Sequence, residues 1–122
     1  MAKILIVDDE IDILEVAERF FKKRGLEVST ASEGTEALRL IQEKSPDLIL
    51  LDYNLPGLSG LEILKKLREE LKLSTKVIMV TGFDTEMVMK ETKGLPIECC
   101  VHKPLDLERL ETIVMTALKS FS

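Results

Sequence analysis

The sequence is poor in features that would each point to a particular class of protein. It has no tryptophan, one tyrosine and two cysteines. No apolar run approaches the roughly 20 residues that a membrane-spanning helix needs. Residues 1–3 are followed by a short apolar run and then by acids, so we expect no signal peptide. These absences predict a soluble, cytoplasmic protein without a membrane partner.

Basic residues are also fewer than acidic ones. The chain has 17 lysines and arginines and 22 acids, which gives a net charge of −5. A nucleic-acid-binding surface needs clustered basic side chains that replace the counterions of the phosphates. We therefore expect no direct nucleic-acid binding, and the acidic clusters favour cations as ligands.

The only two cysteines, Cys99 and Cys100, are neighbours in an apolar stretch. Because neighbouring side chains of a strand point to opposite faces, we expect no disulfide between them. We predict two small, buried thiols in a reducing cytosol.

What the chain does have is a regular alternation of short apolar runs and amphipathic segments. Three of the runs are continuously apolar, which is typical of strands that are covered on both faces. The segments between them carry apolar residues at helical spacing. The predicted strands are residues 4–7, 26–30, 48–51, 77–80 and 97–101, and the helical patterns lie at 11–21, 37–41, 61–71, 84–96 and 107–117.

Boundary signals agree with this division. Gly25 can end the first helix, and Ser59 with Glu62 forms a capping box that can begin the third. Residues 92–96 (TKGLP) indicate that the fourth helix ends early or is irregular. The last helical pattern extends to Phe121, so we expect a single domain over residues 1–122 and no output domain in this chain.

Five strand–helix pairs in alternation predict an α/β fold. Such a chain forms a doubly wound, five-stranded parallel sheet with helices on both faces and right-handed crossovers. In an open parallel sheet the C-terminal ends of the strands lie at one edge, where these folds place their ligands. Residues that end different strands are therefore expected to converge there.

Each polar residue at these strand ends has an ordinary explanation when taken alone. The acids after the first strand complement the dipole of the following helix. Asp52 is a suitable turn residue, and the hydroxyl of Thr81 can bond local backbone. Lys103 alone is typically solvated, and His102 is expected to face away from it along the strand.

Together the same residues form a chemical set. Carboxylates crowded at one edge repel one another unless a cation joins them, and oxygen ligands suit Mg²⁺. Lys103 supplies a compact positive charge for phosphate, and Thr81 can bond a phosphate oxygen. An aspartate held in line with that set is a competent nucleophile that forms an acyl phosphate. The set predicts phosphoryl transfer, which depends mainly on positioning and charge neutralisation.

This constellation resembles the receiver domain of two-component response regulators over the whole chain. The resemblance implies a flavodoxin-like (βα)5 fold with strand order 2-1-3-4-5. The matching residues are Asp8 and Asp9 in VDDE, Asp52 in LLDYNLPGLSG, Thr81 and Gly82 in VTGF, and Lys103 with Pro104.

The resemblance also implies the roles at the metal and the phosphoacceptor. Asp52 would accept a phosphoryl group from the phosphohistidine of a sensor histidine kinase or a histidine phosphotransfer protein. Asp9 and Asp52 would bind Mg²⁺ or Mn²⁺ directly, together with the backbone carbonyl of Asn54. Asp8 would act mainly through water. No turnover of a separate substrate is expected, so the chain would not be an enzyme in the usual sense.

The remaining implications concern the switch. Lys103 would bind the incoming phosphoryl group, Thr81 would turn to bond it once attached, and the Lys103–Pro104 peptide would be cis. The surface of helix 4, strand 5 and helix 5 would then bind an output partner that the sequence does not name. A phosphorylation-dependent homodimer is compatible with the same resemblance.

The chain departs from the family pattern at one switch position. The family commonly has an aromatic residue three positions before the lysine, and here that residue is Cys100. A cysteine side chain is too small to report a state by swinging inward. Phe83, two residues after Thr81, is the available substitute.

Other functions remain open on the residues alone. A receiver-shaped interaction module that works without phosphorylation is the main alternative. An aspartate-nucleophile phosphatase would need a second acid where this chain has Asn54, and a cap domain for which 122 residues leave no room. A flavin-binding protein of the same fold would need backbone amides where this chain places acids.

Overall fold

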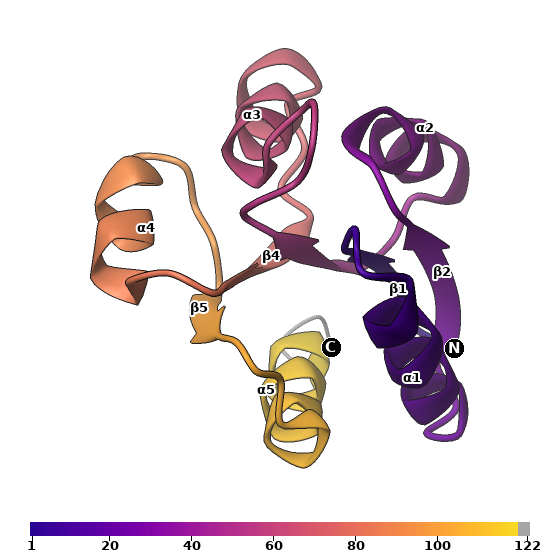
Figure 1. Cartoon of the computed structure of the whole chain (residues 1–122). Coiled ribbons are helices and arrows are strands. Elements are labelled where there is room, and N and C mark those ends of the chain that lie inside the picture. The colour runs from indigo at the N-terminus through magenta and orange to yellow at the C-terminus, as the bar shows by residue number, and fades with distance from the viewer. Residues whose placement is uncertain (120–122) are drawn as a thin grey trace.

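The computed structural model describes residues 1–119 and confirms the predicted alternation of strands and helices. Figure 1 shows the sheet between two layers of helices. The elements are β1 (Lys3–Val7), α1 (Ile11–Lys22), β2 (Glu27–Ala31), α2 (Gly34–Lys44), β3 (Leu48–Asp52), α3 (Gly60–Lys65), the π-helical segment η1 (Lys66–Glu70), β4 (Lys76–Thr81), α4 (Thr85–Glu91), β5 (Cys99–His102) and α5 (Leu107–Lys119).

The sheet has the strand order that the family resemblance implies. Its five strands run parallel in the order β2-β1-β3-β4-β5. The register places Asp52 of β3 opposite Val80 of β4, and Thr81 opposite His102 of β5. Because all the strands point the same way, the polar residues that end them lie along one edge of the sheet.

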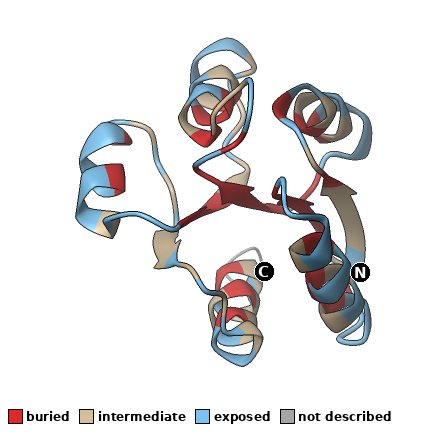
Figure 2. Cartoon of the chain, in the orientation of Figure 1, coloured by how far each residue is buried: buried red, intermediate tan, exposed pale blue. Residues whose placement is uncertain are grey.

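The two faces of the sheet are covered by different helices. Helices α1 and α5 lie on one face, and α2, α3 and α4 lie on the other (Figure 1). Alternate residues of each central strand enter the two layers of core, which explains why these strands are apolar throughout. Figure 2 shows the result as a buried central sheet. The β3 residues in the α1/α5 layer are Leu48 and Leu50, and those in the opposite layer are Ile49 and Leu51.

Most predicted boundaries are confirmed. Gly25 follows α1 with φ of +85°, a conformation that favours glycine. The capping box of Ser59 and Glu62 begins α3 with both of its hydrogen bonds. Asp84 caps α4 by accepting a hydrogen bond from the backbone N–H of Glu86 at 2.9 Å. As expected, α4 is short and ends at Glu91.

The third helix differs from the uninterrupted helix that its apolar spacing suggests. It changes to a π-helical turn at residues 66–70, where the N–H of Leu71 donates to the carbonyl of Lys66. Arg68 lies in this turn. Its guanidinium donates to the carbonyls of Leu73 and Pro96, both at 2.7 Å, and so ties the end of the helix to the segment before β5.

Four further predictions need correction or lie outside the described residues. Strand β5 begins at Cys99 rather than at residue 97, and β2 is displaced by one residue. Cys99 and Cys100 are free, as predicted, but half-buried rather than buried, because β5 is an edge strand with fewer neighbours. The extension of the last helix to Phe121 lies outside residues 1–119. Within these residues, no helix has the length and apolar character needed to cross a membrane.

Candidate functional site

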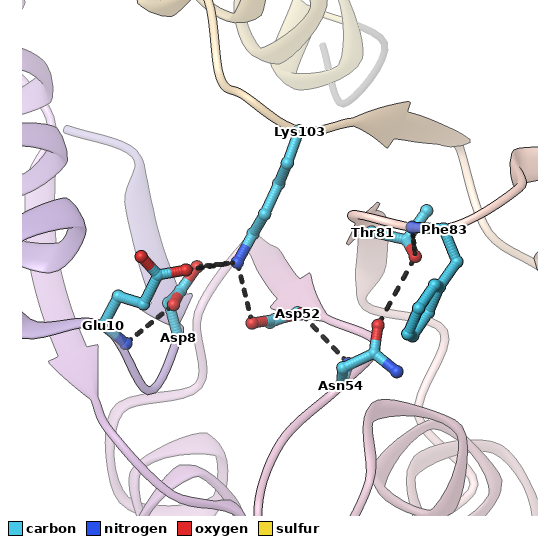
Figure 3. A network of polar contacts seen from close by, with 7 residues as sticks. All are labelled: Asp8, Glu10, Asp52, Asn54, Thr81, Phe83 and Lys103. Carbon is cyan, nitrogen blue, oxygen red and sulfur yellow. Dashed lines mark hydrogen bonds and ion pairs between the residues drawn. The ribbon is translucent and has the colours of Figure 1, made fainter.

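The strand-end residues meet as predicted, and a lysine lies between two acids (Figure 3). The Nζ of Lys103 is 3.0 Å from Oδ2 of Asp8 and 3.0 Å from Oδ2 of Asp52. The exposed fraction is 5% for the Asp8 side chain, 3% for Asp52 and 17% for Lys103. Two buried carboxylates from different strands therefore share one ammonium group.

The backbone orients both acids in the same way. The N–H of Glu10 donates to Oδ1 of Asp8 at 2.9 Å, and the N–H of Asn54 donates to Oδ1 of Asp52 at 3.0 Å. In each case the donor lies two residues after the acid, which is the geometry of an Asx turn. One oxygen of each carboxylate is thus held by the chain, and the other is directed at Lys103.

The position of Lys103 is set by the neighbouring strand. Its backbone N–H donates to the carbonyl of Thr81 at 2.7 Å, and its peptide bond to Pro104 is cis, as the resemblance implied. The exposed carboxylate of Glu10 adds a third, longer contact with Nζ at 3.4 Å. His102 is exposed and lines a groove beside α5 with Arg109, so it lies apart from the acids.

Burial and charge act in opposite directions at this site. Burial raises the pKa of Asp52, as does the charge of Asp8, and hydrogen bonds from Asn54 and Lys103 only partly offset this. Burial opposes the charged form of Lys103, but the two carboxylates outweigh it and raise the lysine's pKa above its ordinary value. Lys103 is therefore charged. The ionised form of Asp52 depends on the hydrogen bonds from Asn54 and Lys103, which favour it against burial.

The acids after β1 are suitable ligands for a metal ion. Asp8, Asp9 and Glu10 each offer a carboxylate oxygen, and these oxygens lie within 4.8 Å of one another. Asp8 is buried, whereas Asp9 and Glu10 are exposed. An all-oxygen set with open positions for water fits Mg²⁺. The division of direct and water-mediated ligands among Asp8, Asp9, Asp52 and the Asn54 carbonyl stays a prediction.

Thr81 lies on the other side of Asp52, where it contacts Asn54 rather than an acid. Its hydroxyl is 3.5 Å from Oδ1 of Asn54 and accepts a hydrogen bond from the N–H of Phe83 at 3.0 Å. Thr81 is fully buried, but Phe83 is 56% exposed. Figure 3 shows Thr81 and Asn54 pointing toward each other.

Sequence reasoning missed one contact next to the site. The hydroxyl of Tyr53 donates a hydrogen bond to the carboxylate of Glu91, the last residue of α4. A buried tyrosine hydroxyl needs a partner, and that was the available signal. The partner itself could not be found from the sequence, because it depends on where α4 ends and how it packs.

The fold and the site together define a class of protein: an open α/β domain with paired acids and a lysine at the C-terminal edge of a parallel sheet. The family model of the response regulator receiver domain matches residues 4–115. The chain belongs to this family, and it is a receiver domain of two-component response regulators.

Two curated relatives are similar over different shares of their length. The chain is 34% identical over 112 residues to sporulation initiation phosphotransferase F of Bacillus subtilis (strain 168). This match covers 92% of this chain and 90% of that protein. It is 44% identical over 84 residues to the alkaline phosphatase synthesis transcriptional regulatory protein PhoP of the same organism. That match covers 69% of this chain but only 35% of PhoP, so the chain spans about a third of that regulator.

Solved structures show the same fold. The receiver domain of the Francisella response regulator 1452 has a TM-score of 0.91 and 29% identity, and the match covers all of both chains. The chemotaxis protein CheY4 of Vibrio cholerae has a TM-score of 0.88 and 31% identity, with 96% of this chain and 98% of that chain covered. These matches confirm the predicted family and fold.

Proposed function

We propose that Asp52 accepts a phosphoryl group from the phosphohistidine of a sensor histidine kinase or a histidine phosphotransfer protein. The observation that carries this proposal is the contact of Lys103 with one oxygen of Asp52 while the Asn54 N–H holds the other. The nucleophile is thereby oriented, and a cation lies beside the place where the phosphoryl group arrives. Similarity to a protein named as a phosphotransferase supports the same reaction.

The transfer is an exchange of one bond to phosphorus. A carboxylate oxygen of Asp52 attacks the phosphorus atom, and an acyl phosphate bond forms. The bond between phosphorus and the donor imidazole nitrogen breaks, and its electron pair stays on the nitrogen, which takes a proton from solvent as it leaves. Lys103 neutralises charge on the phosphoryl oxygens throughout, which is the main requirement of phosphoryl transfer.

The acids next to Asp52 provide the divalent cation site that such a reaction uses. Asp9, Asp52 and the Asn54 carbonyl would hold Mg²⁺ or Mn²⁺, and Asp8 would act mainly through water. When bound, the ion neutralises phosphate charge. Lys103 would then exchange its contact with Asp8 for a contact with a phosphoryl oxygen.

Phosphorylation would switch the surface formed by α4, β5 and α5. Thr81 exchanges Asn54 for a phosphoryl oxygen and draws residues 82–84 toward the site. A shift from mostly inactive to mostly active requires about 5.5 kcal/mol. Two charge-assisted hydrogen bonds, from Thr81 and Lys103, contribute roughly 1.5–3 kcal/mol each. The chain would assist its own phosphorylation and dephosphorylation in the cytoplasm, without turning over a separate substrate.

The test is phosphorylation by acetyl phosphate with Mg²⁺, followed by intact-mass measurement. The wild-type chain should gain the mass of one phosphoryl group, and hydroxylamine should remove it because it cleaves acyl phosphates. Asp52→Asn should gain none. Asp47→Asn is the matched control, because Asp47 precedes β3 at the opposite edge of the sheet, and it should be labelled like the wild type.

Omission of Mg²⁺ should suppress the adduct. An adduct of equal amount on Asp52→Asn would refute the assignment of the acceptor. A wild-type chain that gains no adduct from acetyl phosphate or from a phosphorylated histidine kinase would favour the phosphorylation-independent interaction module.

A further inference from the structure

Tyr53 links the proposed phosphoacceptor to helix α4. It directly follows Asp52, the residue is 8% exposed, and its hydroxyl donates to Glu91 at the end of α4. Glu91 itself is an exposed residue, so the contact lies at the margin of the core. This hydrogen bond joins the β3–α3 segment to the helix that carries the switching surface.

The backbone at the Tyr53 end of this link is anchored on both sides. The Tyr53 N–H donates to the carbonyl of Val80 at 2.8 Å, and its carbonyl accepts from the N–H of Gly60 at 3.0 Å. A side chain at Gly60 would collide with the backbone of Asp52 and Tyr53, so the two segments are in close contact. The backbone of Tyr53 is therefore held independently of α4.

Glu91 is connected to Thr81 through the length of α4, because the first residue of this helix follows Thr81 closely. Only residues 82–84 separate β4 from α4, and Asp84 caps the helix, so the loop and the helix must move together. The Thr81 hydroxyl holds the N–H of Phe83 in this loop at 3.0 Å. When Thr81 turns to a phosphoryl group, that bond is lost, and we expect the loop and α4 to shift and the contact between Glu91 and Tyr53 to change.

We infer that the Tyr53–Glu91 hydrogen bond is a latch that holds α4 in its unphosphorylated position, and that these two positioning residues set how readily Asp52 is phosphorylated. This inference rests on the proposed function. It also supplies a link between the site and α4 in a chain whose Cys100 is too small to provide one by swinging inward.

The direction of the effect follows from the populations of the two states. A contact made in only one of them favours that state, and in this proposal acetyl phosphate reacts with the active state in proportion to its population. Loss of the latch should therefore raise the rate of phosphorylation by acetyl phosphate by about fivefold, the size expected for one net hydrogen bond. A residue that merely supported the fold would lower this rate or leave it unchanged when altered.

The experiment compares four single variants with the wild type. Tyr53→Phe keeps the ring and removes the hydroxyl, and Glu91→Ala removes the acceptor; both should be phosphorylated about fivefold faster. Glu91→Gln keeps an acceptor and should stay near the wild-type rate. Glu86→Ala makes the same change of charge in the first turn of α4 and is the matched control. The double variant Tyr53→Phe with Glu91→Ala should be no faster than either single variant, because both remove one bond.

Two measurements test the latch without relying on the phosphorylation rate. Amide hydrogen exchange in α4 of the unphosphorylated protein should be faster in Tyr53→Phe, particularly at Val88 and Thr92, and unchanged in Glu86→Ala. Tyr53 is the only tyrosine and the chain has no tryptophan, so its fluorescence reports on the bond directly. A carboxylate acceptor quenches tyrosine emission, and emission should rise when the wild type is phosphorylated.

The outcomes separate the latch from the proposed function. Equal phosphorylation rates in Tyr53→Phe and the wild type, or unchanged exchange in α4, overturn the latch while the proposed function stands. Unchanged Tyr53 emission in the phosphorylated wild type shows that the bond persists in both states, which also overturns it. A wild type that accepts no phosphoryl group refutes the proposed function and the regulatory role together.

Discussion

Replacement of Lys103 by methionine tests whether this lysine neutralises two buried acids. The variant keeps most of the side-chain volume but leaves Asp8 and Asp52 facing each other without a cation. At an effective dielectric constant of about 20, each 3.0 Å contact has a gross attraction of about 5.5 kcal/mol. Desolvation of the charged groups cancels much of this, and loss of one partner of a buried pair typically costs about 3–5 kcal/mol.

We expect the lower end of that range for Lys103→Met. The lysine side chain is 17% exposed, so water can reach the carboxylates once the ammonium group is gone. Destabilisation of about 3 kcal/mol would be a large share of the total stability of an ordinary domain. It is measured by urea unfolding in EDTA, where the midpoint should fall without a change in slope.

A second substitution checks the cause. Because the pKa of Asp52 is raised, its ionised form is costly in the fold, and Asp52→Asn should restore about 1–2 kcal/mol to Lys103→Met. Added Mg²⁺ should stabilise Lys103→Met more than the wild type, since the ion binds the folded acids. An unchanged unfolding midpoint in Lys103→Met, or no recovery in the double variant, would refute the charge-neutralisation reasoning.

Three other predictions concern residues around the site. Gly60→Ala should lower the free energy of unfolding by about 2–3 kcal/mol, because a Cβ there collides with the backbone of Asp52. Ser59→Ala should cost about 1 kcal/mol through loss of the N-cap of α3. Burial raises the pKa of the Cys99 and Cys100 thiols, so the folded chain should be alkylated more slowly than unfolded chain at about pH 8.

The predictions for Gly60 and Ser59 each have a control in the chain. Gly82→Ala has open space for its Cβ and should change stability by less than about 0.5 kcal/mol; an equal effect at both glycines would contradict the steric argument. Glu62→Ala removes the other half of the capping box, and a Ser59→Ala variant as stable as the wild type would show that the box contributes nothing.

The sign of the thiol effect is fixed by linkage. The folded pKa values lie above the unfolded ones, so folding stability from these thiols is complete below the unfolded pKa and is lost as pH rises through the folded pKa. Alkylation should accelerate over the same alkaline range. Thiols in the folded chain that react as fast at about pH 8 as those in denatured chain would contradict the burial argument.

Local patterns were sufficient to predict the elements and their order. Continuous apolar runs marked the central strands because both faces of a parallel sheet are buried, and the capping box at Ser59 and the glycine at position 25 marked helix ends. Where the prediction was wrong, distant contacts decided. The π-helical turn at residues 66–70 contains Arg68, which reaches the carbonyl of Pro96 on a distant segment. No local pattern reports such a partner.

The sequence alone determined that acids, a threonine and a lysine end the strands, and strand direction alone brought them to one edge. Only the tertiary structure decided how they pair: Lys103 joins Asp8 to Asp52, whereas Thr81 contacts Asn54. It alone showed that Tyr53 reaches Glu91. The reason is physical, because burial, charge pairing and hydrogen-bond partners depend on side-chain positions across strands, and these are set by packing rather than by sequence spacing.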